Sequence, residues 1–245
     1  MKVTIIILGI LFLCAGTLSY SQVTLQLGGG LGLVSPTGDM SGTTIDYYGG
    51  QKFGLSTGFT LFGKARLGLL GFNIVSEVSY TALNNDGNSE PGKGSVKVSQ
   101  SVLAVKAGPE FKLNIPASPV TPYLGFQLAL NRFSGETTFQ GVSKVPSATY
   151  SVESASRFGI GFNGGVLIGI GTSLSLDVSA GYNLLNVGGR SFTDVNPSQK
   201  ERIDSYLALN DAKDPLYQPG DDKNFIAGER SMSSFQFVVG VMFGI

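Results

Sequence analysis

Charged side chains in otherwise apolar stretches are the residues of this chain best placed to do chemistry. Each lies on the side of its segment that carries small or polar residues, opposite a row of large apolar ones. They are Lys64, Glu77, Lys106, Glu110, Lys112, Arg157 and Asp177. Both signs are present, and an unpaired charge in an enclosed interior is costly, so we expect these residues to form ion pairs. Glu77 and Lys106 lie in consecutive segments, at similar distances from the connection between them. We therefore predict that these two residues pair.

A second group of candidate residues lies in the long polar segment 184–231. Residues 196–199 read Asn-Pro-Ser-Gln, which is typical of a helix start with an N-cap Asn and Pro in the first turn. Ile203, Tyr206 and Leu207 then share one helical face, so we predict a helix of about three turns across the mouth of the fold. Four of the acidic residues in this segment are candidate metal ligands, Asp211, Asp214, Asp221 and Asp222. Their spacing does not match a calcium loop, and we predict no metal site.

Composition excludes several classes of function. The 245 residues include no His, which removes Ser-His and Cys-His nucleophile pairs and the commonest metal ligand. Lys and Arg number 17 and so do Asp and Glu, so there is no net positive charge to favour nucleic acid. The glycine-rich run 28–32 lacks the Lys of a phosphate-binding loop. We therefore predict no catalytic site, no cofactor and no nucleic-acid partner.

The first residues have the pattern of a secretory signal peptide. Lys2 precedes an apolar run over 3–15, and Ser19 and Ser21 supply small residues before a cleavage point at Gln22. The run is shorter than the ~20 residues that a membrane-spanning helix needs. We expect residues 1–21 to be a signal peptide and residues 22–245 to form one domain. Cleavage would remove Cys14, which is the only Cys.

Beyond the signal peptide, the chain is dominated by alternation of large apolar residues with small or polar ones, which indicates strands with two different faces. Eight segments show it, near 23–33, 53–64, 70–82, 98–113, 121–132, 157–170, 174–183 and 235–245. A soluble barrel would turn the apolar row inward, whereas a membrane barrel turns it to lipid. The other row is rich in Gly, Ser and Asn, which would leave a soluble exterior with too little charge but suits the narrow lumen of an eight-stranded membrane barrel.

The predicted connections are sorted by length. Short ones follow the second, fourth and sixth strands, at 65–69, 114–120 and 171–172. Long polar ones follow the first, third, fifth and seventh strands, at 35–52, 83–97, 133–156 and 184–231. Short turns at one rim and long loops at the other are typical of outer-membrane proteins. We therefore predict an all-β fold, an eight-stranded antiparallel up-and-down transmembrane β-barrel.

Aromatic residues of the apolar row gather near the strand ends, as in the two girdles of a membrane barrel. The outer girdle would comprise Phe53, Tyr80, Phe158, Tyr182 and Phe235, and the periplasmic one Phe72, Phe111 and Phe243. Pro109 cannot donate a ladder hydrogen bond, so we expect a bulge or a strand end there.

Three stretches carry a family resemblance: 108–113 closing a strand, 121–125 opening the next, and the strand 235–245 at the C-terminus. With the alternation, they make residues 22–245 similar to the small OmpA/OmpX-like, porin-family barrels of Gram-negative, Bacteroidetes-type bacteria. The resemblance implies a place in the outer membrane of the cell envelope, in contact with its lipid and lipopolysaccharide. It also implies recognition of the last strand by the barrel-assembly machinery, although Ile245 stands where Phe is usual. The family has no shared catalytic residues.

Together these observations predict a non-enzymatic outer-membrane protein with a structural or surface-interaction role, in which long extracellular loops bind a ligand or partner. One alternative is a narrow channel for small solutes, lined by the inward charges. The other is a soluble secreted barrel that binds a ligand, which requires the large apolar residues to face inward.

Overall fold

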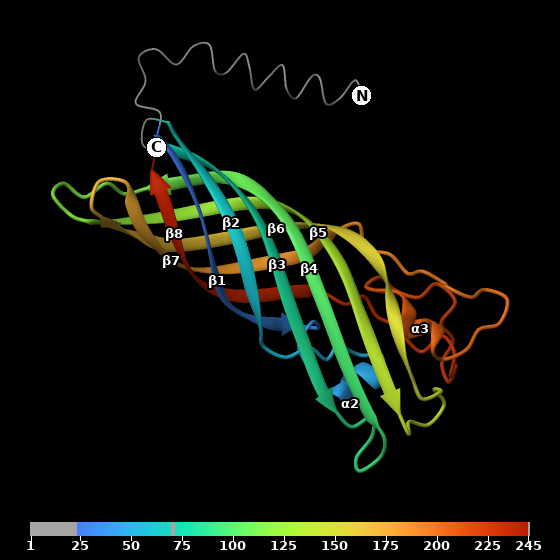
Figure 1. Cartoon of the computed structure of the whole chain (residues 1–245). Helices are drawn as coiled ribbons and strands as arrows, with labels where there is room; N and C mark the ends of the chain where they lie inside the picture. The colour runs from blue at the N-terminus through green and yellow to red at the C-terminus, as the bar shows by residue number, and fades with distance from the viewer. Residues whose placement is uncertain (1–23, 70–71, 245) are drawn as a thin grey trace.

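The computed structural model describes residues 24–69 and 72–244, and these form a closed barrel whose eight antiparallel strands follow chain order (Figure 1). The strands are β1 Thr24–Gly38, β2 Gly58–Leu69, β3 Phe72–Gly87, β4 Ser95–Lys112, β5 Val120–Gln140, β6 Ala148–Ile170, β7 Leu174–Gly188 and β8 Met232–Gly244. Because β8 pairs with β1, the sheet has no open edge. The predicted eight-stranded up-and-down barrel is confirmed. The predicted signal peptide lies outside the described residues.

Two short helices, α2 Thr44–Tyr48 and α3 Asp204–Leu207, lie in the loops at the end of the barrel away from the start of β1 (Figure 1). Across residues 24–69 and 72–244, no helix is long and apolar enough to cross a membrane.

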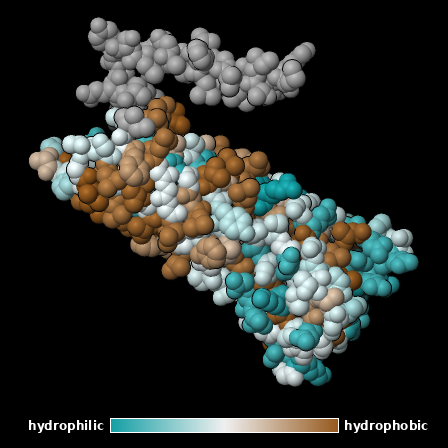
Figure 2. Space-filling view, viewed as in Figure 1, coloured by the Kyte–Doolittle hydropathy of each residue, from teal (hydrophilic) through white to brown (hydrophobic). Residues whose placement is uncertain are grey.

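The large apolar side chains face outward over the part of the barrel nearest the start of β1 and the end of β8. They form a brown belt in Figure 2, and the loop end beyond it is mostly hydrophilic. Leu128 and Phe237 are 47% and 48% exposed, whereas Lys106 and Asp177 are buried inside. The soluble-barrel alternative is therefore wrong, because it requires the opposite orientation.

Beyond the belt, the outward positions of the strands carry polar residues and the inward positions carry apolar ones. On β4, Leu103 is the last large apolar residue to face outward, and Lys97 and Ser99 take the outward positions further along. The inward residues there, Val98 and Val102, are buried. The loop end of the barrel therefore has a polar exterior and an apolar interior, as a water-soluble barrel does.

This reversal of the two faces explains why the predicted loops 83–97 and 133–156 are wrong. The strands β3 to β6 continue past the belt, so that the connections are only 88–94 and 141–147. Where the apolar row moves from the outer to the inner face, two apolar residues stand side by side, as Val102 and Leu103 do, and the simple alternation breaks. The predicted turn 65–69 is also wrong, because β2 continues to Leu69.

Most of the predicted girdle residues are exposed on the outer face. Phe53 is the exception: it precedes β2 and is buried in the loop, with the Arg230 guanidinium carbon 4.0 Å from its ring centroid. Pro109 lies near the end of β4, where the ladder to β5 is interrupted and resumes at Glu110 in the same register, so it causes no bulge.

The helices differ from the prediction. The start predicted at Asn196 is a turn, and α3 is a single turn over Asp204–Leu207. The helix α2 was not predicted, although its start carries a capping box. Thr43 accepts a hydrogen bond from the backbone of Asp46, and the Asp46 carboxylate accepts one from the backbone of Thr43.

Candidate functional site: a filled lumen beneath a folded loop cap

The lumen within the apolar belt contains a cluster of six buried charged residues, three of each sign. This charge cluster comprises Lys64, Arg66, Glu77, Lys106, Glu110 and Asp177. Lys106 donates to Glu77 at 3.0 Å, which is the pair that the register predicts. Lys64 lies 3.6 Å from the same carboxylate and donates to Asp177 at 3.1 Å. The ion pairs therefore connect β4, β3 and β2 to β7 across the lumen.

Arg66 extends this chain of ion pairs back to β4. Its Nη2 donates to Asp177 at 2.9 Å and its Nε to Glu110 at 2.9 Å. Tyr123 donates to the other oxygen of Asp177 at 2.5 Å, and Asn73 donates to Glu110 at 3.0 Å. Each of these carboxylates thus has more than one donor, which offsets the cost of burying it.

Arg66 is the member of the charge cluster that the sequence analysis missed, because residues 65–69 were assigned to a turn. Lys64 and Arg66 are two residues apart and therefore share a face of β2, which was the available signal. Lys112 is only half-buried, and it donates to the side-chain oxygen of Gln26 at 3.2 Å rather than joining the cluster.

Small residues make room for this filling on the inner face. The ring of Phe62 extends from β2 across β1 to Gly240 of β8. Gly240 is paired with Gly30 of β1. A Cβ atom at residue 240 would come within 2.8 Å of that ring. The close approach requires glycine at this position.

The loop end of the lumen is filled by side chains from the loops 39–57 and 189–231, which we call the loop cap. Tyr206 lies at its centre, with its ring centroid 5.2 Å from that of Tyr47 and 5.0 Å from that of Phe139. Burial raises the pKa of Tyr206, so its hydroxyl stays neutral and donates to the carbonyl oxygen of Tyr48 at 2.5 Å. Of the other residues predicted for a mouth helix, Ile203 is buried and Leu207 is half-buried against the same core.

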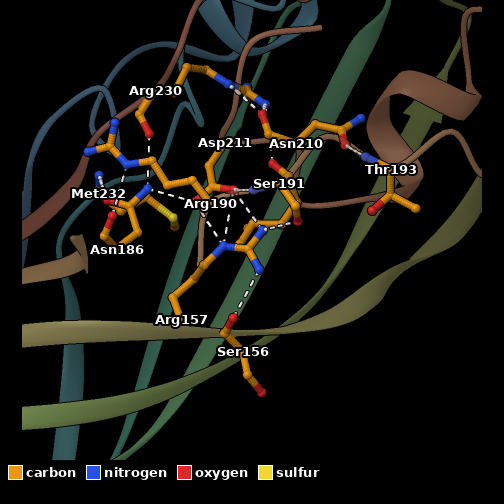
Figure 3. Close-up of polar contacts among 11 residues, drawn as sticks. Ser156, Arg157, Asn186, Arg190, Ser191, Thr193, Asn210, Asp211, Arg230 and Met232 are labelled. Atoms are coloured by element: carbon orange, nitrogen blue, oxygen red, sulfur yellow. Dashed lines mark hydrogen bonds and ion pairs between the residues drawn. The ribbon is translucent and has the colours of Figure 1, made fainter. Parts of the chain in front are cut away.

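Arg157 does not belong to the charge cluster but fastens the cap to the barrel wall. Its guanidinium binds both oxygens of Asp211 in the loop 189–231, with Nη2 to Oδ1 at 2.6 Å and Nε to Oδ2 at 2.9 Å (Figure 3). Asn186 of β7 and the backbone N–H of Ser191 also donate to this carboxylate, at 2.7 and 3.1 Å. We call these four residues the latch.

Two opposing effects act on the latch carboxylate. Burial alone would raise the pKa of Asp211, but the hydrogen bonds from Arg157, Asn186 and Ser191 outweigh it and hold that pKa below its ordinary value. Asp211 is therefore ionised at neutral pH and pairs with a positive partner in a site where its own exposure is 0%.

The charge cluster and the loop cap fill the lumen from its two ends. Between the charge cluster and the loop cap, a cavity lined by Ser79, Asn183 and Gln236 measures about 20 Å³, enough for about one water molecule. Within the part of the chain that the structure describes, no three His, Cys, Asp or Glu side chains are grouped to hold a metal ion.

Comparisons with known proteins give distant similarities to solved structures and one family match. No curated protein sequence matches the chain. Solved structures similar to it include Neisserial surface protein A, at 16% identity and a TM-score of 0.45 over 90% of this chain and 96% of that one. A major outer membrane protein of Thermus thermophilus has 15% identity and a TM-score of 0.49 over 91% and 99%. OprG of Pseudomonas aeruginosa has 9% identity and a TM-score of 0.41 over 92% and 97%.

A family model matches the sequence itself. The model of the outer membrane protein beta-barrel domain matches residues 5–201. The outward apolar belt and the closed ring of strands are the features that such a domain requires in a bilayer. This chain therefore belongs to the outer membrane protein beta-barrel domain family and resides in the outer membrane.

Proposed function

We propose that this protein is a non-conducting, non-enzymatic outer-membrane barrel whose loop cap presents a preformed binding surface to the outside of the cell. The observation that carries the proposal is that the lumen is filled twice, by the charge cluster and by the loop cap. A channel would need a continuous wet path, and the cavity of about 20 Å³ between the two fillings is not one.

The order of the loop cap supports a surface role. The helix α2 has reciprocal caps at its start, Tyr47 bonds to Thr137 of β5, and Tyr48 donates to the carbonyl oxygen of Ser143 at 2.6 Å. A surface that is already ordered loses little conformational entropy when it binds a partner. As further partners we propose lipid and lipopolysaccharide at the apolar belt and the barrel-assembly machinery at β8.

Conductance in planar bilayers distinguishes the surface role from the channel alternative. The refolded full chain should show no discrete conductance steps, and neither should Asp211→Ala, because the charge cluster stays in place when the cap loosens. Glu229→Gln, which breaks an exposed ion pair of the same loop, serves as the matched control. Reproducible single-channel steps in the unmodified protein would replace the proposal with the narrow channel.

The surface role is tested with the same protein in proteoliposomes. They are presented to an array of immobilised glycans and extracellular-matrix proteins, with liposomes that carry a variant with 195–226 replaced by a short Gly-Ser linker as the comparison. Binding that the linker variant loses supports the proposal. Equal binding by both, or binding by neither, contradicts it.

A further inference from the structure

One cavity of the loop cap has a single charged residue in its lining. It measures about 30 Å³ and lies where the loop cap meets β4 and β5. Its lining includes Tyr47, Gln100, Thr137, Tyr206 and Arg230, and the rest of the lining is uncharged. Burial raises the pKa of Tyr47 to about 12, so this hydroxyl does not supply a negative charge at neutral pH. The cavity therefore has a net positive charge.

Arg230 is buried without a carboxylate partner. It is 5% exposed, and among the described residues no carboxylate oxygen lies within 4.0 Å of its guanidinium. Its hydrogen bonds run from Nε and Nη2 to the carbonyl oxygens of Leu209 and Asn210, and these bonds do not use Nη1. Burial lowers its pKa only to about 10, so the group is charged at neutral pH.

The neighbouring charges do not neutralise Arg230. Asp211 is fully engaged by Arg157, Asn186 and Ser191, and it lies beyond ion-pair distance of Arg230. Asp39 accepts the backbone N–H of Ser231 at 2.8 Å and is also too distant. The two guanidiniums and one carboxylate buried here leave one positive charge in excess, a costly state in a low-dielectric interior.

A second polar group points to a ligand in the same cavity. Gln100 of β4 is 9% exposed and lines the cavity, and its Oε1 has no hydrogen-bond partner in the described part of the chain. The two ends of a Gln side chain are nearly isosteric, so turning the amide over presents two N–H donors in place of that oxygen. In that orientation Gln100 would place an amide donor in the lining of the cavity beside Arg230, whose guanidinium packs on the Phe53 ring at 4.0 Å but has no carboxylate partner among the described residues. A donor and a charged guanidinium in one small cavity suit an acceptor with a negative charge.

We propose that this cavity binds one small monovalent inorganic anion, chloride in the native setting, held by Arg230 and Gln100. A volume of about 30 Å³ admits one or two particles the size of water, which suits a halide. The anion joins the loop 189–231, which carries Arg230, to the barrel wall, which carries Gln100. The site does not depend on the surface role proposed above.

Loop cleavage measures whether the anion fastens the cap. The refolded full chain is treated with trypsin in sodium gluconate or sodium chloride of equal ionic strength, and cleavage within 195–226 is followed. When loop opening precedes cleavage, bound anion slows it by a factor of 1 + [anion]/Kd, about tenfold at nine times Kd. Arg230→Gln should cut at the same rate in both salts, whereas Arg190→Gln, an exposed arginine of the same loop, should keep the full chloride effect.

Two further measurements keep the proposal falsifiable if Arg230→Gln fails to fold. Gln100→Leu, which leaves Arg230 in place, should weaken chloride protection at least threefold. Crystals grown in sodium bromide should show an anomalous peak within hydrogen-bond distance of Arg230 Nη1. Equal cleavage rates in both salts, or a bromide-free cavity occupied only by water, would overturn the assignment, while the non-conducting surface role would remain untouched.

Discussion

Removing the latch carboxylate should release the loop 189–231 while leaving the barrel folded. Among the described residues, Arg157 forms an ion pair with Asp211. In Asp211→Ala this ion pair is lost, while Arg157 stays buried at 5% exposure. Breaking a buried pair by deleting one partner costs about 3–5 kcal/mol. The cost falls on the loop, because the strand ladders that close the barrel do not involve this contact.

The free-energy loss converts into a cleavage rate. If the loop opens and closes quickly compared with cutting, trypsin cleavage follows the population of the open form, and 3 kcal/mol corresponds to a roughly 100-fold or greater increase. The assay follows cleavage after Lys200, Lys213 and Lys223 in detergent micelles, while an unheated gel reports that the barrel is still folded.

A matched control separates the latch from any change in loop charge. Glu229→Gln breaks the exposed pair with Arg190, at 3.3 Å, and such pairs contribute about 0–1 kcal/mol, so cleavage should change less than about fivefold. A double-mutant cycle with Arg157→Met should show coupling, because the second substitution removes the stranded charge. Cleavage of Asp211→Ala at the rate of the unmodified protein would refute the reasoning.

Three more outcomes are expected. Asp177→Asn removes the charge shared by Lys64 and Arg66 and should lower the temperature at which the folded gel band disappears, by an amount that reflects about 3–5 kcal/mol. The folded pKa of Asp211 is lowered, so its stabilisation is complete above the ordinary value of 3.8 and is lost as pH falls below it; hydrogen exchange of the loop 189–231, corrected for intrinsic rates, should be faster at pH 2.5 than at pH 5. Leu128→Arg places a charge in the belt at a cost of about 2–4 kcal/mol and should reduce folding into lipid vesicles, whereas Glu136→Arg on the same face beyond the belt should fold normally.

Much of the fold follows from local pattern. A strand with one large apolar face and one small polar face can satisfy its backbone in lipid only as part of a closed sheet, so eight such segments predict a barrel and its orientation. The same period of two placed Lys106 and Glu77 on the inner face and at one height, where they pair at 3.0 Å. Composition alone removed the histidine-dependent chemistries.

The sequence pattern failed where the surroundings of the strands change. Beyond the belt, Val98 and Phe139 point inward because their apolar neighbours there are the side chains of the loop cap and not lipid. Which residues lie above the membrane depends on strand tilt and on what fills the lumen, neither of which is a local property. The alternation therefore inverts on β3 to β6, and strands were taken for loops.

The sequence by itself determined that this chain forms a lipid-facing barrel with charges inside, because side-chain direction along a strand is fixed by the backbone. Only the tertiary structure decided what those charges do. Arg157 meets Asp211 from a loop 54 positions away, and Arg230 meets no carboxylate within ion-pair distance among the described residues. Such contacts depend on how a long loop folds back into the barrel, which no spacing along the chain encodes.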